Sequence, residues 1–260
     1  MTIEAIVVIA IAGFLAGALN AAAGGGTLIS FPVLVWLGVP PITANISSSV
    51  GLLTGYLGGS IAYRKELSVQ KRRVGTFTVV SIVGGVAGAL LLLSTSASVF
   101  EGLVPFLVLG AAALLGFQPM VSRALARRRE KSPVVDMQGE VSNGVPLLAQ
   151  VGVMAAAIYG SYFGAGLGVM LLAVLALTVN DDLQKLNGLK TLLSLLINTI
   201  GVLVFISTAS VDWTIIAVLA PAALLGGTLG GTFARKLPAA VLRGVVVTFA
   251  TVSGAILLFS

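Results

Sequence analysis

The stretch ALNAAAGGGTLISFPVL, residues 18–34, interrupts an apolar segment with three consecutive glycines and then becomes apolar again. Glycine allows a sharp turn and leaves the backbone N–H and C=O groups uncovered. If the flanking segments lie in a membrane, such a turn is stable only where protein surrounds it or where it lines a wet cavity. The rest of the chain decides whether this condition applies.

The composition is that of a membrane protein. Of 260 residues, 57% are hydrophobic and 9% charged, and the mean hydropathy is +1.09, which leaves too little polar surface for a soluble globule. Most of the apolar segments are long enough to span a hydrocarbon core of about 30 Å. The segments are residues 3–22, 25–38, 42–63, 74–93, 99–118, 145–162, 166–179, 183–206, 211–233 and 239–259. Two of them, 25–38 and 166–179, are short and indicate re-entrant or broken helices.

The first segment has a second interpretation, because the small residues 21–23 are typical of a signal-peptide cleavage site. A signal peptide begins with positive charge, whereas MTIEA, residues 1–5, contains no Lys or Arg. We therefore expect this segment to remain in the protein as a membrane helix.

The net charge is +6, and most cations lie in two clusters. These are Arg64, Lys65, Lys71, Arg72 and Arg73, and then Arg123, Arg127, Arg128, Arg129 and Lys131. Loop cations of this kind set membrane topology, so we expect a lipid bilayer and no nucleic acid as partner. The chain has no Cys and no His, which excludes thiol chemistry and the commonest zinc sites. No cofactor or metal is predicted.

The chain contains an internal repeat. A shift of 142 positions aligns the glycine stretch at 23–26 with residues 165–168, and Asn45 with Asn187. The repeat covers about residues 13–118 and 155–260, joined by a polar linker from Ser122 to Gly144. The predicted organisation is a first membrane repeat at 1–120, a basic linker at 121–144 and a second membrane repeat at 145–260.

Charge shows how the repeats are related. The loop at 64–73 is basic, whereas its counterpart at 207–213 has no cation. The loop at 94–101 has no cation either, whereas its counterpart carries Arg235, Lys236 and Arg243. Under the positive-inside rule, equivalent loops then lie on opposite faces of the membrane, so the repeats are inverted. The amino terminus is predicted outside and the basic linker in the cytoplasm.

Inversion requires an odd number of crossings in each half. Three transmembrane helices plus a glycine-tipped hairpin satisfy this requirement, and five short crossings would satisfy it too. We favour the first arrangement, which makes the fold an all-α polytopic membrane protein with two inverted-topology repeats.

The glycine turns are predicted to bind an anion. A helix that starts near Thr27 directs its positive end and unpaired N–H groups at the turn, which is an anion-binding geometry. The substrate-binding residues predicted here are Gly24, Gly25, Gly26 and Thr27 in the first half and Gly164, Gly166 and Gly168 in the second. Glycines also permit close helix packing, and this interpretation is favoured for Gly84, Gly85, Gly88, Gly226, Gly227 and Gly230.

A polar face follows each hairpin, with residues spaced three and four apart on one side of a helix. In the first half it comprises Asn45, Ser48, Ser49 and Tyr56, and in the second Asn187, Lys190, Thr191, Ser194 and Asn198. Polar side chains in membrane helices often serve packing. Two matched stripes, one of them with a lysine, favour a substrate path.

Lys190 lies deep in its predicted helix, where a cation costs about 2.5–3.5 kcal/mol unless it meets water or a partner. An anionic substrate is one such partner. The side chain could instead extend to the cytoplasmic interface, or pair with Asp181 or Asp182.

The stretch AAAGGGTLISFPVLVWLGVPPITANISSS, residues 21–49, resembles the sulfite exporter TauE/SafE family of membrane permeases. The pattern recurs more weakly in FGAGLGVMLLAVLAL, residues 163–177, followed by LQKLNGLKT. Val174 stands where Pro32 stands in the first half, and this departure leaves open whether both turns break their helices alike. The resemblance covers almost the whole chain and implies a bacterial inner-membrane permease that moves small anions, such as sulfite, sulfonates, sulfoacetate or organic acids, often outward.

The leading hypothesis is therefore a secondary transporter, and the resemblance implies that it exports its substrate. The alternative is a passive anion channel of the same architecture. An enzyme is not expected, because His and Cys are absent and nearly all carboxylates lie at segment ends or in the linker. The same scarcity of carboxylates disfavours a cation transporter.

Overall fold

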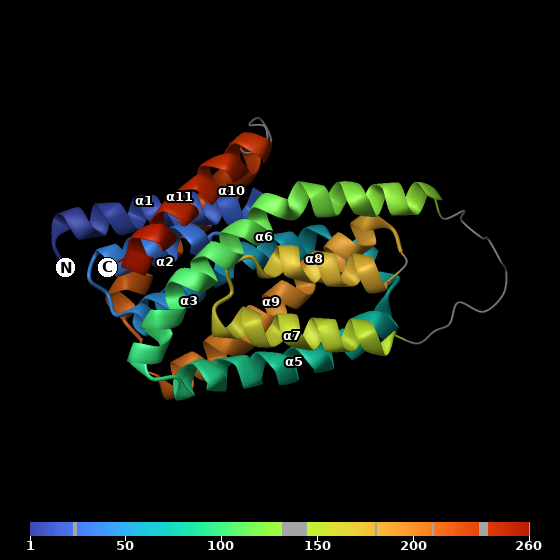
Figure 1. Ribbon diagram of the computed structural model, residues 1–260, viewed down its shortest axis with the longest axis horizontal. Helices are drawn as coiled ribbons and strands as arrows, with labels where there is room; N and C mark the ends of the chain where they lie inside the picture. Colours follow the sequence, from blue (N-terminus) through green and yellow to red (C-terminus); the bar gives the residue numbers. More distant parts are fainter. Residues whose placement is uncertain (23–24, 132–144, 180, 210, 234–238, 260) are drawn as a thin grey trace.

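The computed structural model describes residues 1–22, 25–131, 145–179, 181–209, 211–233 and 239–259, and every regular element in these ranges is a helix (Figure 1). The helices of the first half are α1 (Ile3–Ala22), α2 (Thr27–Trp36), α3 (Pro41–Ala62), α4 (Arg64–Ser68), α5 (Lys71–Ser94) and α6 (Ala97–Lys131). Those of the second half are α7 (Leu147–Tyr162), α8 (Leu167–Thr178), α9 (Leu183–Thr208), α10 (Trp213–Phe233) and α11 (Ala239–Phe259).

The predicted all-α membrane fold is confirmed. In the described residues, α1, α5, α6 and α9 are long and apolar enough to cross a membrane, and several shorter apolar helices accompany them. Each of the ten apolar segments coincides with one helix, because a continuous apolar run buries its backbone hydrogen bonds most easily as a helix. The short basic helix α4 is additional.

The boundary predicted at residue 120 does not coincide with a helix end. Helix α6 continues to Lys131, so the first part of the predicted linker at 121–144 is helical. Arginine and lysine are good helix formers, and the polar sequence that follows Met120 extends the helix without interruption. Residues 132–144 lie outside the described part.

Each half contains two consecutive helices separated by glycines, of which the second, α2 or α8, is short. Gly25, with a φ of 99°, and Gly26 lie between α1 and α2, and we call this region the first glycine turn. Residues 163–166 between α7 and α8 form the second glycine turn, in which Gly164 and Gly166 have φ values of 79° and 76°. Such angles favour glycine. Helix α8 is a short helix like α2, so Val174 in place of a proline does not change the element.

Helices from the two halves pack closely on each other. A Cβ atom on Gly226 of α10 would lie 1.9 Å from the carbonyl oxygen of Phe14 in α1, and one on Gly88 of α5 would lie 2.1 Å from that of Ile158 in α7. Gly84 of α5 is likewise packed against α7. The close-packing role expected for these three glycines is therefore confirmed.

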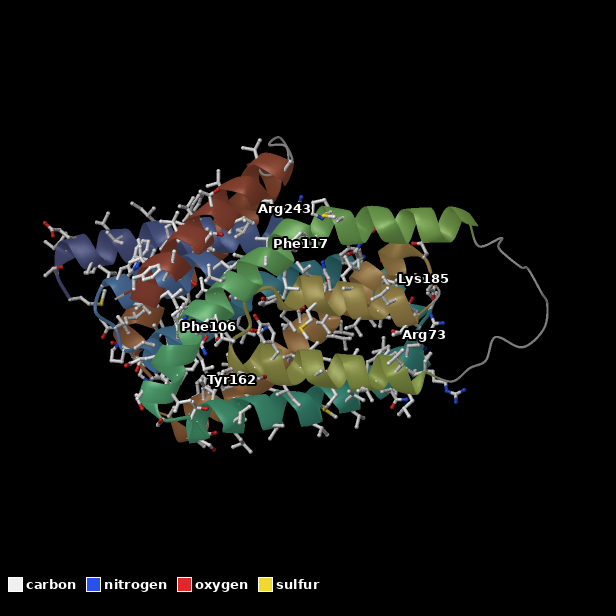
Figure 2. All side chains as sticks on the ribbon, in the orientation of Figure 1. Arg73, Phe106, Phe117, Tyr162, Lys185 and Arg243 are labelled. Carbon is white, nitrogen blue, oxygen red and sulfur yellow. The ribbon has the colours of Figure 1, made fainter. Side chains whose placement is uncertain are left out.

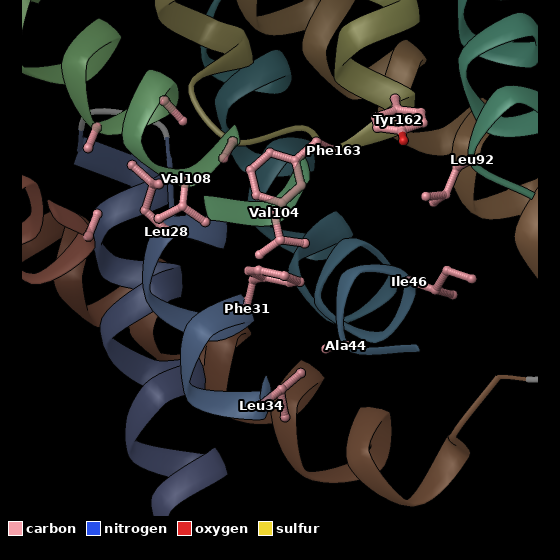
Figure 3. Close-up of a cluster of buried hydrophobic side chains, with 14 of the residues drawn as sticks. Leu28, Phe31, Leu34, Ala44, Ile46, Leu92, Val104, Val108, Tyr162 and Phe163 are labelled. Carbon is pink, nitrogen blue, oxygen red and sulfur yellow. The ribbon is translucent and has the colours of Figure 1, made fainter. Parts of the chain in front are cut away.

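The buried apolar side chains form two main clusters. One lies mainly among α1, α2, α3, α6, α10 and α11, with Ala89 and Leu92 of α5, Val169 of α8 and Phe205 of α9 added, and the other lies among α5, α7, α8 and α9. The second glycine turn connects them, since Tyr162, Phe163 and Ala165 belong to the first cluster although α7 and α8 belong to the second (Figure 3). The fold thus places this turn against the first half of the chain.

Candidate functional site

The two glycine turns lie against the same part of α6. A Cβ atom on Gly25 would lie 3.8 Å from Leu115, and one on Gly166 would lie 3.7 Å from Ala111, one helical turn away. The rings of Phe31 and Phe163 also meet edge to face, with centroids 5.2 Å apart (Figure 3). The structure therefore brings the two turns together, although the open side of Gly25 faces leucine side chains and that of Gly166 faces the backbone and methyl group of Ala111, whose carbonyl oxygen is 3.6 Å from the Cβ position.

A buried hydrogen bond joins the halves at this point. The side-chain Nδ2 of Asn45 on α3 donates to the carbonyl oxygen of Tyr162 over 2.8 Å, and Asn45 is only 1% exposed. The Oδ1 atom of the same amide has no hydrogen-bond partner among the described residues. Asn45 therefore anchors the second glycine turn through its Nδ2 atom, while its Oδ1 atom has no described donor.

Asn20, Tyr56 and Asn198 converge between the two turns, and we call them the central polar cluster. The Cβ atom of Asn20 lies 3.3 Å from the position of a Cβ on Gly26, and Oδ1 of Asn198 lies 4.0 Å from that of a Cβ on Gly164. Tyr56 interacts with the side chains of both asparagines. These residues come from α1, α3 and α9, so the cluster depends on both halves.

Several hydrogen-bonding groups in this region have no partner among the described residues. Both amide atoms of Asn20 are buried and, apart from the interaction with Tyr56, have no hydrogen-bond partner among the described residues. The backbone N–H groups of Ala165, Gly166 and Gly168 likewise donate no hydrogen bond to any residue that the structure describes. Unpaired buried donors are costly, and a ligand that accepts from them removes that cost. Successive free N–H groups beside left-handed glycines form a concavity suited to an anion.

Lys190 lies beside the start of α8. Its Cδ atom is 3.9 Å from the position of a Cβ on Gly168, which brings together two residues that were predicted separately. Lys190 forms no salt bridge with any described residue, since Asp181 pairs with Arg73 and Lys185 instead. The alternative in which Asp181 neutralises Lys190 is therefore wrong.

Asp182 is not the partner of Lys190 either. It caps α9, where its Oδ1 atom accepts a hydrogen bond of 2.7 Å from the backbone N–H of Gln184. Lys190 is thus a partly buried cation with no protein anion beside it in the described structure.

The remaining predicted residues occupy varied environments. Thr27, Ser48 and Ser194 are buried, and the hydroxyl groups of the two serines have no hydrogen-bond partner among the described residues. Ser49 and Asn187 are partly buried, and the hydroxyl of Thr191 donates to the carbonyl of Asn187 within α9. Gly24 lies outside the described residues.

Sequence reasoning missed Asn20. Two signals were present: it is the one polar residue in the otherwise apolar and glycine-containing run from Gly13 to Gly26, and it lies about one helical turn before the glycines. Its partner under the shift of 142 is Tyr162, whose carbonyl receives the hydrogen bond of Asn45. Neither signal shows by itself that the side chain points to the turn.

A separate cavity of about 250 Å³ lies between α1, α2 and α11. Its lining is apolar and includes Val8, Ile11, Val33 and Phe249. It offers no donor to an anion and is not part of the candidate site. In the part of the chain that the structure describes, no group of three or more acidic side chains is placed to hold a metal ion.

Comparison with known proteins places the chain in a family. The family model described as sulfite exporter TauE/SafE matches residues 9–257. A probable membrane transporter protein of Haemophilus influenzae is 23% identical over 94% of this chain and 91% of its own length. The probable membrane transporter protein YfcA of Escherichia coli K12 is 24% identical over 94% of this chain and 86% of its own. No solved structure matches significantly. The chain is a multi-pass membrane transporter, not an enzyme, and belongs to the sulfite exporter TauE/SafE family.

Proposed function

We propose that this protein is a secondary transporter of small anions, such as sulfite, sulfonates including sulfoacetate, or related organic anions, and that it acts as an exporter. The observation that carries the proposal is the central polar cluster, where Asn20, Tyr56 and Asn198 meet the two glycine turns. The family and the names of the relatives support transport, and the chemistry of the cluster supports an anion.

The site would bind an oxyanion mainly through neutral donors. The amide of Asn20, the hydroxyl of Tyr56 and the free N–H groups of Ala165, Gly166 and Gly168 donate hydrogen bonds without carrying net charge. A transported ion must bind well enough to enter and weakly enough to leave, and neutral donors meet both requirements.

Lys190 would attract the anion toward this site. It is the eighth residue of α9 and stands by Gly168, so it lies between the basic end of the molecule and the central polar cluster. An anion that passes would neutralise a cation that has no other partner among the described residues.

Alternating access would follow from inverted repeats, in which residues 1–120 and 145–260 are related through the membrane plane. The exchange of loop charge between the halves and the equivalent glycine-separated helix pairs α1–α2 and α7–α8 support this arrangement. We further propose a bacterial inner-membrane location with the amino terminus outside and the basic linker at 121–144 in the cytoplasm, on the positive-inside rule.

Transport in vesicles tests the proposal. Purified protein is reconstituted, and the flux of radiolabelled sulfite and sulfoacetate is measured with and without an imposed gradient. We expect saturable flux that Asn20→Ala reduces at least tenfold and that the exposed substitution Lys65→Ala leaves unchanged. Absence of flux for every small anion would disprove the proposal, whereas flux that does not saturate and only follows the anion gradient would indicate the channel.

A further inference from the structure

A polar contact joins the two halves at the end of the molecule where α5 begins and α8 is followed by α9. Arg73 of α5 forms a salt bridge with Asp181, and Nζ of Lys185 lies 3.0 Å from the other carboxylate oxygen (Figure 2). Beside it, Nε2 of Gln70 donates to the carbonyl of Lys185 over 3.2 Å. The charged side chains of the contact are partly exposed, at 40% for Lys185, 27% for Arg73 and 14% for Asp181, whereas Gln70 is buried.

The equivalent positions in the other half are apolar. Under the shift of 142 positions, Arg73 corresponds to Ile215 and Asp181 to Val39. Ile215 is 2% exposed in the first apolar cluster, and Val39 packs against the same cluster. Polar groups thus meet at the first pair of positions, whereas the second pair joins the apolar cluster, and we call the surroundings of Val39 and Ile215 the apolar contact.

The contact lies next to the candidate substrate path. A Cβ atom on Gly188 of α9 would lie 3.4 Å from Tyr63 and 3.5 Å from Glu66, so the segment around α4 covers the first turns of α9. Lys190 and Ser194, one helical turn apart, lie on the other side of α9, where the Lys190 side chain approaches Gly168 of α8. Asp181 stands in the connection between α8 and α9, so its release from Arg73 would free this end of the helix pair and let water reach Lys190 and the region around Ser194.

We propose that Arg73, Asp181, Lys185 and Gln70 form the cytoplasmic gate of the transporter, a latch that opens while the apolar contact around Val39 and Ile215 stays closed. The inference rests on the proposed transport path. A partly exposed ion pair separates at little cost because water solvates both charges. Opening the apolar contact exposes hydrophobic surface to water and is opposed more strongly. Changes in charge or salt concentration should accordingly affect the opening of the latch and not that of the apolar contact.

Cysteine labelling tests the latch directly, because the chain contains no cysteine. Ser194→Cys supplies a single thiol at a position that is 2% exposed. A membrane-impermeant anionic methanethiosulfonate is applied to either face in oriented vesicles. We expect Asp181→Asn and Arg73→Gln to raise the labelling rate at least fivefold from the cytoplasmic face only, with no further rise in the double variant. Arg73→Lys keeps the charge and should label within twofold of the parent.

Asp182→Asn is the matched control, since it changes the neighbouring carboxylate and retains a side chain that can cap α9. It should leave the labelling rate unchanged. An unchanged rate in Asp181→Asn, or an equal rise in Asp182→Asn, would overturn the proposal.

A second measurement needs no substitution in the latch. Raising NaCl from about 0.05 to about 0.5 M screens exposed charges and should increase cytoplasmic labelling of Ser194→Cys at least threefold. A rate independent of salt would also overturn the latch. Labelling requires no substrate, so the latch can fail while anion flux persists, and flux can be absent while the latch responds.

Discussion

Asn45 and Tyr162 are 117 positions apart in sequence, yet the side-chain amide of Asn45 donates a 2.8 Å hydrogen bond to the carbonyl of Tyr162. The bond fixes the last residue of α7 against α3, so one half of the chain holds the glycine turn of the other. The interior has no water to replace it, because Asn45 is 1% and Tyr162 8% exposed.

Asn45→Ala should therefore destabilise the protein. The substitution leaves the Tyr162 carbonyl buried without a partner, at a cost of about 1–3 kcal/mol. Thermal unfolding in detergent measures the effect. Asn187→Ala is the matched control at the equivalent position, where no side-chain hydrogen bond is seen among the described residues. Equal destabilisation by both substitutions would contradict a special role for Asn45.

Asn20→Ala should reduce transport without the loss of stability expected for Asn45→Ala. Apart from the interaction with Tyr56, both buried amide atoms of Asn20 lack a hydrogen-bond partner in the described structure, so their removal should change stability by no more than about 1 kcal/mol. Anion flux should fall at least tenfold. Sulfite should also no longer raise the unfolding temperature, because ligand stabilisation depends on binding to the native state. Loss of stability with retained flux would show that Asn20 serves packing.

Lys190→Ala should reduce flux without unfolding the protein. The substitution removes a cation that has no ion-pair partner among the described residues and whose burial opposes folding. We expect at least a tenfold fall in flux and an unfolding temperature equal to or above that of the parent. Lys65→Ala, at an exposed position, should change neither quantity. Unchanged flux in Lys190→Ala would remove this residue from the substrate path.

Substitutions of glycine by alanine should separate close packing from open positions. In Gly88→Ala the new Cβ atom would lie 2.1 Å from the carbonyl oxygen of Ile158, so α5 and α7 must move apart and little folded protein is expected. Gly110→Ala meets nothing within 4 Å and should fold normally. Gly164→Ala forces a side chain into the left-handed region at a φ of 79°, which costs about 1–2 kcal/mol. Yield and monodispersity on size exclusion, with thermal unfolding, rank the three.

The latch should be insensitive to pH across the neutral range. Burial opposes ionisation of Asp181, but hydrogen bonds from the Asp182 N–H, Lys185 and Arg73, together with the charge of Arg73, outweigh it and hold the pKa of this carboxyl below its usual value. Because the folded pKa is lowered, the ionised latch is fully present above the ordinary aspartate pKa of about 3.9 and is lost only as pH falls through the lower folded value. Cytoplasmic labelling of Ser194→Cys, corrected for reagent reactivity, should therefore be constant from about pH 5 to 8. A midpoint near pH 6 would contradict this assignment.

Much of the helical framework could be predicted from sequence because its causes are local. Each apolar run became a helix, and glycines in the left-handed region stand between α1 and α2 and between α7 and α8. The end of α6 was missed, since a polar helix with good helix formers carries no apolar signal beyond Met120. Lys190 was predicted as a buried cation. Its lack of a protein partner follows from the tertiary structure, in which Asp181 forms ion pairs with Arg73 and Lys185 instead.

By itself, the sequence determined that this chain lies in a membrane as helices, because hydrophobicity and backbone hydrogen bonding act within each segment. The tertiary structure alone decided that Asn20, Tyr56 and Asn198 meet between the glycine turns, and that α1 packs on α10 and α5 on α7. The rotation of each helix about its axis follows from which small residues admit a neighbour's backbone. That choice depends on partners in distant parts of the chain, such as Ile158 for Gly88 and Phe14 for Gly226, so no local pattern contains it.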